Sequence, residues 1–346
     1  MMRIQSIIED QEYRFLRETA AAYAAKELGP RAEELDLNRD AATLKEIASR
    51  AGEMGLLAAL IPEEKGGGGL DDYAFCAALE EIAVHEAGVA ASLLIHNAAL
   101  YPLALNASEA PVSDSFPACL AYPGKVSLSG GKVEGNVPFA FNAGACQMIT
   151  VLPSNHGGAV AALLEAAEGV EIKLDPYPMG LRITQPGSIN FKSAESSQII
   201  SETNLTGSVS RILLLGFASI AVGIIRNSLG KAYDYARERY QAGKMIIEHQ
   251  QLRIFMAEMI AAIEQARSVV KSACDTEDIG AAVAGWLLAT EKAVKAATDG
   301  VQIHGGYGYM RDYGMERLMR DAKYCQMYPL TSQEALLRLF DLYEKE

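Results

Sequence analysis

The fold of this chain is decided by one stretch, Lys125-Val126-Ser127-Leu128-Ser129-Gly130-Gly131-Lys132-Val133-Glu134. Apolar and polar residues alternate on both sides of the Gly-Gly pair, a pattern typical of two β-strands joined by a two-residue hairpin turn. Similar strand patterns follow at residues 147–152, 159–164, 170–174 and 188–191. We therefore predict a β unit from about Pro117 to Ile200.

Helical patterns flank this β unit on both sides. Before it, Leu44, Ile47, Ala48 and Ala51 recur at i, i+3, i+4 and i+7, which indicates an amphipathic helix. After it, long apolar-periodic segments cover residues 208–240, 247–274 and 279–303. The order is α, then β, then α. We predict three domains, a helical domain at 1–112, a β-domain at 113–206 and a helical bundle at 207–346.

Charge and cysteine usage exclude several classes of protein. The 346 residues carry a formal net charge of −13, and their Lys and Arg residues are scattered rather than clustered. This pattern gives little electrostatic support for a nucleic-acid or anionic-membrane surface. Residues 1–11 contain no apolar segment typical of a signal peptide. The five cysteines form no CxxC motif, so neither a zinc site nor a disulfide framework is expected. We predict a cytoplasmic protein that binds neither nucleic acid nor a membrane.

Four groups of residues, spread over nearly the whole chain, are more specific. They are residues 54–71 with their glycine run, 235–250, 302–309 and 316–322. Together and in this order they resemble the acyl-CoA dehydrogenase family. The resemblance implies an α+β fold with an N-terminal helical domain, a middle β-barrel domain and a C-terminal four-helix bundle. It also implies a flavoprotein that acts in the oxidation of an acyl-CoA thioester, an oxidoreductase reaction of fatty acid metabolism.

The resemblance further implies that FAD binds at the domain junction and that a second chain completes the site. The residues that match FAD contacts are Arg239, Gln250, Gln302, Gly305, Gly306, Thr331 and Gln333. It assigns Arg239 to the diphosphate or adenosine of an FAD across the dimer, and a guanidinium suits this role because it pairs bidentately with phosphate. Glycine lets backbone amides approach a diphosphate without an intervening Cβ. Arg211 matches, about one helical turn out of register, an arginine that contacts substrate or CoA phosphate.

Each of these residues also has an ordinary structural explanation. Arg239 and Gln250 could belong to a helix surface, and Gly305-Gly306 could be a left-handed cap at a helix end. For Arg211, a surface position at a helix start is the favoured explanation.

The chain departs from the family pattern where the flavin ring would be lined. The family segment Trp-Ile-Ser or Trp-Ile-Thr, whose hydroxyl bonds the ring, reads Phe139-Ala140-Phe141 here. A family Phe that contacts the cofactor is replaced by Ala242, and the family segments upstream of the ring have no counterpart between Pro117 and Ser129. The residues expected to line the flavin ring therefore differ from the family pattern.

The catalytic base is also missing. The family's Tyr-Glu-Gly-Thr segment, whose Glu removes the α-proton of the thioester, reads Tyr328-Pro329-Leu330-Thr331 here. Proline can neither accept a proton nor donate a backbone N–H. The other base position known in the family aligns near Leu213, which has no carboxylate beside it. Glu334 is better explained as a solvated helix residue and Asp321 as an ion-pair partner of Arg317 or Lys323. We therefore assign no catalytic residue.

Three hypotheses follow. In the first, the chain is a subunit without its own catalytic Glu that completes the FAD site of a partner from the same family. In the second, it is a self-sufficient FAD enzyme with an atypical base or different acyl-CoA chemistry; a homodimer, a heterodimer and a tetramer built as a dimer of dimers all remain open. In the third, it is a cofactor-free structural paralogue. The first two imply an acyl-CoA substrate, and the family commonly passes electrons to an electron-transfer flavoprotein.

Overall fold

In a computed structural model of the protein, residues 13–106, 116–158, 160–165 and 168–344 are described. The predicted boundary between residues 112 and 113 lies outside these ranges. The N-terminal part is helical, with α1 (Arg14–Tyr23), α2 (Ala32–Asn38), α3 (Ala41–Glu53), α4 (Asp72–Ala83) and α5 (Ala87–Asn106). Side chains fix two of the helix starts. Asp40 caps α3 by accepting from the Thr43 backbone N–H at 2.8 Å, and Asp71 caps α4 by accepting from Ala74 at 2.7 Å.

The middle part consists of two four-stranded sheets. One has the order β1 (Ala118–Ala121), β4 (Met148–Val151), β5 (Val160–Glu165), β8 (Gln198–Ser201). The other has the order β2 (Lys125–Ser129), β3 (Lys132–Ala140), β7 (Gly187–Glu195), β6 (Val170–Leu174). Buried residues from both sheets share one core, which includes Ile149 and Val137. The predicted β unit is thus confirmed, although β1 and β8 were not predicted as strands.

The hairpin that decides this part of the fold has the expected geometry. Strands β2 and β3 pair antiparallel, with Ser129 opposite Lys132. Gly130 and Gly131 between them have φ values of 56° and 80°. Two consecutive positive φ values require residues that tolerate this backbone region, which is why the Gly-Gly pair predicts the turn.

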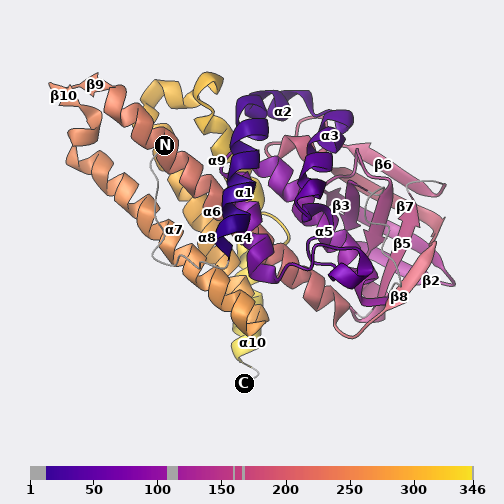
Figure 1. The fold of residues 1–346 in the computed structure, drawn as a ribbon. Coiled ribbons are helices and arrows are strands. Elements are labelled where there is room, and N and C mark those ends of the chain that lie inside the picture. The colour runs from indigo at the N-terminus through magenta and orange to yellow at the C-terminus, as the bar shows by residue number, and fades with distance from the viewer. Residues whose placement is uncertain (1–12, 107–115, 159, 166–167, 345–346) are drawn as a thin grey trace.

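Long helices return after the sheets. They are α6 (Leu205–Glu238), α7 (Gln250–Thr276), α8 (Ile279–His304), α9 (Met315–Cys325) and α10 (Ser332–Tyr343). A short hairpin of β9 (Tyr240–Gln241) and β10 (Lys244–Met245) joins α6 to α7. Figure 1 shows the long helices on one side of the molecule, the sheets on the other and the N-terminal helices between them. The predicted α, β, α order and helical bundle are confirmed.

Helix α6 is the central element of the core. It is apolar and long enough to cross a membrane by length and composition, but 89% of its most apolar window is buried inside the protein. Helices on both sides of α6 bury it. One continuous core contains Leu94 of α5, Phe217 of α6 and Trp286 of α8. This core joins the N-terminal helices to the bundle.

Candidate functional site at the junction of the sheets and the bundle

Helix α6 separates the predicted site residues into two groups. At a rise of ~1.5 Å per residue its 34 residues span about 50 Å. Arg211 lies near its first turn and Arg239 is its C-cap residue. In Figure 1 the β9–β10 hairpin and α10 lie at opposite ends of the bundle. The residues predicted to bind one cofactor are therefore not brought together within one chain.

The first group gathers at the hairpin end. The Arg239 guanidinium carbon lies 5.9 Å from the centre of the Tyr307 ring, so the end of α6 meets the segment after α8. Gln302 is on the last turn of α8, and Gln250 is the first residue of α7. Arg239, Gln250, Gln302, Gly305 and Gly306 are all exposed. These five side chains and backbones form an open surface, which we call the Arg239 surface.

The structure requires glycine at only one of the two glycine positions of this surface. Gly305 is the C-cap of α8 with φ 59° and ψ −136°, a conformation that strongly favours glycine. The helix-end explanation therefore accounts for Gly305, although its ψ lies outside the left-handed helical region. At Gly306, a Cβ would meet no atom of the described residues within 4 Å, and its φ is not positive. Packing within the described residues does not require Gly306, so its open backbone is available to another molecule.

The second group lies near the start of α6, beside a cleft of about 920 Å³. The Arg211 guanidinium forms an ion pair with Asp72 and donates to the carbonyl oxygens of Ala273 at 3.1 Å and Cys274 at 3.3 Å. Only 13% of its side chain is exposed. The explanation as a surface arginine at a helix start is therefore wrong, because Arg211 links α6 to α4 and to the last turns of α7.

The cleft beside Arg211 has an acidic lining. Its charged lining residues are Asp71, Asp72, Asp275, Glu277, Arg211 and Arg338. Acidic residues outnumber basic ones, and like charges repel across short distances. This lining disfavours the phosphates of CoA, so the predicted substrate role of Arg211 gains no support from its surroundings.

Thr331 and Glu334 have a local task at the start of α10. The Glu334 carboxylate accepts from the backbone N–H and the hydroxyl of Thr331, both at 2.8 Å, and the Glu334 N–H donates back to the Thr331 oxygen at 3.3 Å. This is a capping box. The hydrogen bonds from Thr331 lower the pKa of Glu334, which makes it a weaker base. Gln333, also predicted to bind FAD, is exposed on the first turn of α10.

Between these two ends, five aromatic side chains pack together. They are Phe139, Phe141, Phe217, Tyr324 and Tyr328, here called the aromatic cluster. Ring centroids are 4.8 Å apart for Phe139 and Phe141, 5.0 Å for Phe141 and Tyr328, and 5.4 Å for Phe217 and Tyr328. Tyr324 packs against both Phe139 and Phe141. The cluster includes the segment that matches the flavin-lining strand and the residue before Pro329.

The Tyr328 side chain is held in place by its hydroxyl, which donates to the Tyr122 carbonyl oxygen at 2.5 Å. Tyr328 is 4% exposed, and burial raises the pKa of its phenol well above the ordinary value. The neighbouring Pro329 is buried as well. Leu213, at the other base position of the family, is fully buried. Neither residue carries a carboxylate itself, and both are packed into the core.

These observations test whether the residues present fit FAD. The two segments that the resemblance places at the flavin ring and at the reacting carbon meet inside the aromatic cluster, where side chains fill the space. The ring of an FAD in the same chain does not fit there. The Arg239 surface, in contrast, offers a guanidinium and an open glycine backbone, which suit a diphosphate.

A buried group of carboxylates that includes Asp321 of α9 was not found by sequence reasoning. Asp321 accepts from the Leu181 backbone N–H at 2.7 Å, and burial raises its pKa to about 6. Burial also raises the pKa of Glu86, to about 7. Arg317 donates to the Ala32 carbonyl oxygen at 2.6 Å and lowers both pKa values through its charge. Asp321 is thus a buried link to the middle domain, and of the two predicted partners it is the charge of Arg317 that acts on it.

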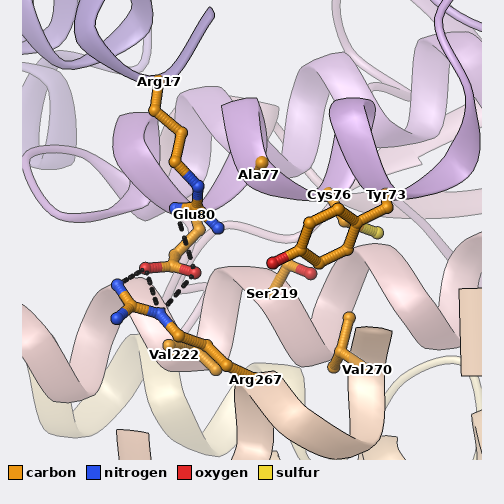
Figure 2. A pocket seen from close by; sticks show the side chains of 9 residues that line it. All are labelled: Arg17, Tyr73, Cys76, Ala77, Glu80, Ser219, Val222, Arg267 and Val270. Atoms are coloured by element: carbon orange, nitrogen blue, oxygen red, sulfur yellow. Dashed lines mark hydrogen bonds and ion pairs between the residues drawn. The ribbon is translucent and has the colours of Figure 1, made fainter. Parts of the chain in front are cut away.

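A second charged group joins the N-terminal helices to the bundle (Figure 2). Glu80 of α4 accepts from Arg267 Nε at 3.1 and 3.2 Å and from Arg226 Nη1 at 2.7 Å. Arg17 of α1 lies 3.5 Å from the same carboxylate. The adjacent cavity has a volume of about 10 Å³, room for about one water molecule. This group is structural, because no cofactor or substrate fits beside it.

Comparisons with known proteins agree with the motifs. The acyl-CoA dehydrogenase N-terminal domain matches residues 10–120, and the acyl-CoA dehydrogenase C-terminal domain matches residues 209–333. An acyl-CoA dehydrogenase of Bacillus subtilis is 30% identical, over 93% of this chain and 95% of its own length. The chain belongs to the acyl-CoA dehydrogenase family. Members of this family are flavoprotein oxidoreductases that bind FAD.

Solved structures confirm the acyl-CoA dehydrogenase fold. Butyryl-CoA dehydrogenase from Megasphaera elsdenii has a TM-score of 0.85 at 23% identity, covering 99% of this chain and 100% of its own. A chain from a structure of the electron transferring flavoprotein of Acidaminococcus fermentans has a TM-score of 0.86 at 24% identity, with the same coverage. At these identities the likeness shows the fold alone. The predicted fold class is therefore confirmed over 99% of this chain.

Proposed function

We propose that this acyl-CoA dehydrogenase-family chain is a subunit without its own catalytic base that completes the FAD site of a partner chain. One contrast carries the proposal. Pro329 is buried beside the aromatic cluster, whereas the Arg239 surface is open. Most groups that would act within this chain are replaced or occupied, with the exposed Gln333 as the exception, and groups that would act on a neighbouring chain are exposed.

The residues of the Arg239 surface would bind and orient the cofactor end that is remote from the chemistry. The guanidinium of Arg239 would pair with phosphate oxygens, and the exposed backbone at Gly306 would allow close approach of the diphosphate. FAD supplies the hydride acceptor when the oxidation of an acyl-CoA thioester takes place. The partner chain supplies the base and the lining of the flavin ring, and an electron-transfer flavoprotein takes up the electrons.

The first test is flavin stoichiometry, measured by absorbance after extraction. The protein is expressed alone, and then together with a longer family member whose Tyr-Glu-Gly-Thr segment is intact, preferably from a neighbouring gene. We expect no FAD on the chain alone and about one FAD per pair of chains in the co-purified complex. One FAD per chain when it is alone would support the self-sufficient enzyme instead. No FAD in either preparation, or no stable complex, would support the cofactor-free paralogue.

A further inference from the structure

We infer that the aromatic cluster closes this chain's own flavin-ring position and has become the structural joint between the sheets and the bundle. The inference deepens the proposed function and rests on it, since the proposal assigns the flavin ring to the partner's site. The proposed function says only that the residues lining the flavin ring are lost in this chain. The inference adds that packed aromatic rings fill the flavin-ring position itself.

The packing of the cluster leaves its central rings no room to move aside. Seven ring pairs have centroids 4.8 to 6.1 Å apart. Phe141 and Phe217 are 0% exposed, and Tyr328 is 4% exposed. Protein interiors of this kind are close-packed, and a planar tricycle could enter only by displacing several buried rings into water.

The elements that carry the five rings come from different parts of the molecule. Phe139 is on β3 and Phe141 follows it, while Phe217 is on α6. Tyr324 is on α9, and Tyr328 lies between α9 and α10. The cluster therefore connects the middle sheets to the central helix and to the end of the bundle.

Polar groups extend this joint at its edges. The Tyr328 hydroxyl donates to the Tyr122 carbonyl oxygen, next to β1. The Tyr324 hydroxyl accepts from the Met179 backbone N–H at 3.1 Å, in the segment between β6 and β7. Both phenols of the cluster thus bind the backbone of the middle part.

The decisive experiment uses lumiflavin, which contains the isoalloxazine ring without the ribityl diphosphate and adenosine. This probe reports on the ring position alone and is blind to the Arg239 surface. We expect no saturable change in lumiflavin fluorescence when the full chain, purified alone, is titrated into it. Saturable binding at one site per chain, lost in Phe141→Trp, would overturn the inference.

A second measurement tests whether the cluster is packed without voids. The Phe141→Ala variant should contain an apolar cavity that binds benzene, so benzene should raise the Tm of this variant and leave the Tm of the wild type unchanged. If the Phe141→Ala variant does not fold, the Phe141→Leu variant is used in its place. Phe15→Ala is the matched control, because Phe15 is 80% exposed. A rise of the wild-type Tm with benzene would show an existing void and contradict a closed position.

The co-purified complex separates the inference from the proposed function. One FAD per pair of chains supports both of them. Two FAD per pair would overturn the closed ring position while leaving the assembly intact. If the complex does not form and the chain alone binds no lumiflavin, the closed position stands and the proposed function fails.

Discussion

The ring of Phe141 meets the ring of Tyr328 edge to face, with 5.0 Å between their centroids and an interplanar angle of 77°. Phe141 directly follows strand β3, and Tyr328 precedes Pro329 at the family's base position. One contact thus joins the segment expected to line the flavin ring to the segment expected to carry the base. Both segments take part in packing here.

Truncation of the cluster should destabilise the protein strongly. For Phe141→Ala we expect a loss of ~3–5 kcal/mol in the free energy of unfolding, because Phe141 is fully buried and leaves a cavity. Urea unfolding, followed by circular dichroism, measures this loss. The exposed Phe15→Ala should change the same free energy by less than ~0.5 kcal/mol. Equal effects of the two substitutions would show that the cluster is not a packed joint.

Arg239 should matter for cofactor retention in the complex and not for folding. Arg239→Gln removes the guanidinium and should lower the FAD content of the co-purified complex about tenfold or more, which corresponds to the ~1.5–3 kcal/mol of a charged hydrogen bond. Its circular dichroism spectrum and Tm should match the wild type. Arg237→Gln is the matched control, since Arg237 is an exposed neighbour on the same helix. A similar loss of FAD in both variants would argue against a specific role.

The charged group of Figure 2 should respond to the loss of one partner. Among the described residues, Glu80→Gln would leave the buried Arg267 with only Glu264 at 3.8 Å, whereas Arg17 and Arg226 would keep their ion pairs with Glu81. Because uncompensated buried charge is costly, we expect a loss of ~3–5 kcal/mol in unfolding free energy. Glu171→Gln, which removes the exposed ion pair with Lys192, should leave the urea midpoint unchanged. Wild-type stability of Glu80→Gln would mean that water compensates this group.

Glu86 should contribute a fall in stability as pH rises from about 4.5 to about 7, against the opposite contribution of His96, whose pKa burial lowers to about 3. Burial raises the pKa of this carboxyl from 4.5 to about 7. At Glu86 the folded state then binds more protons than the unfolded state in this window, so through this group each step up in pH favours unfolding. Asp321, whose pKa burial raises to about 6, acts in the same direction.

The Glu86→Gln variant should lose the part of the pH dependence that comes from Glu86. A neutral amide cannot titrate, so the unfolding free energy at the upper end of the window, relative to that at the lower end, should be ~1–3 kcal/mol higher than in the wild type. Urea unfolding at both pH values measures it. The exposed Glu64→Gln is the control and should keep the wild-type slope. A slope identical to that of the wild type in Glu86→Gln would show that Glu86 takes up no proton in this window.

The turn between β9 and β10 should tighten when Ala242 becomes glycine. Ala242 has φ 53° and Gly243 has φ 83°. A residue with a Cβ is disfavoured in this region by ~1–2 kcal/mol. Ala242→Gly should therefore slow hydrogen exchange of the Ile246 amide, which donates to the Arg239 carbonyl oxygen at 2.8 Å. The same change at the exposed helix residue Ala257 should instead destabilise the protein by ~1 kcal/mol.

Site prediction from the sequence was uneven for a physical reason. The sequence alone shows that Pro329 cannot act as a base, because a backbone without N–H and a side chain without oxygen cannot do that chemistry wherever they lie. The fate of Arg211 is not visible, because its partner Asp72 comes from another domain. The carboxylate of Glu80 is likewise surrounded by arginines from α1, α6 and α7. Such contacts depend on how helices pack.

The sequence by itself determined the local elements and their order. Gly130-Gly131 specifies the hairpin because both residues need positive φ, and Asp40 specifies the start of α3 because its side chain caps the backbone. Only the tertiary structure decided that Phe139, Phe141, Phe217, Tyr324 and Tyr328 form one cluster. Local preferences extend over a few residues, whereas these rings come from segments far apart in the chain and meet only when α6 is buried between the domains.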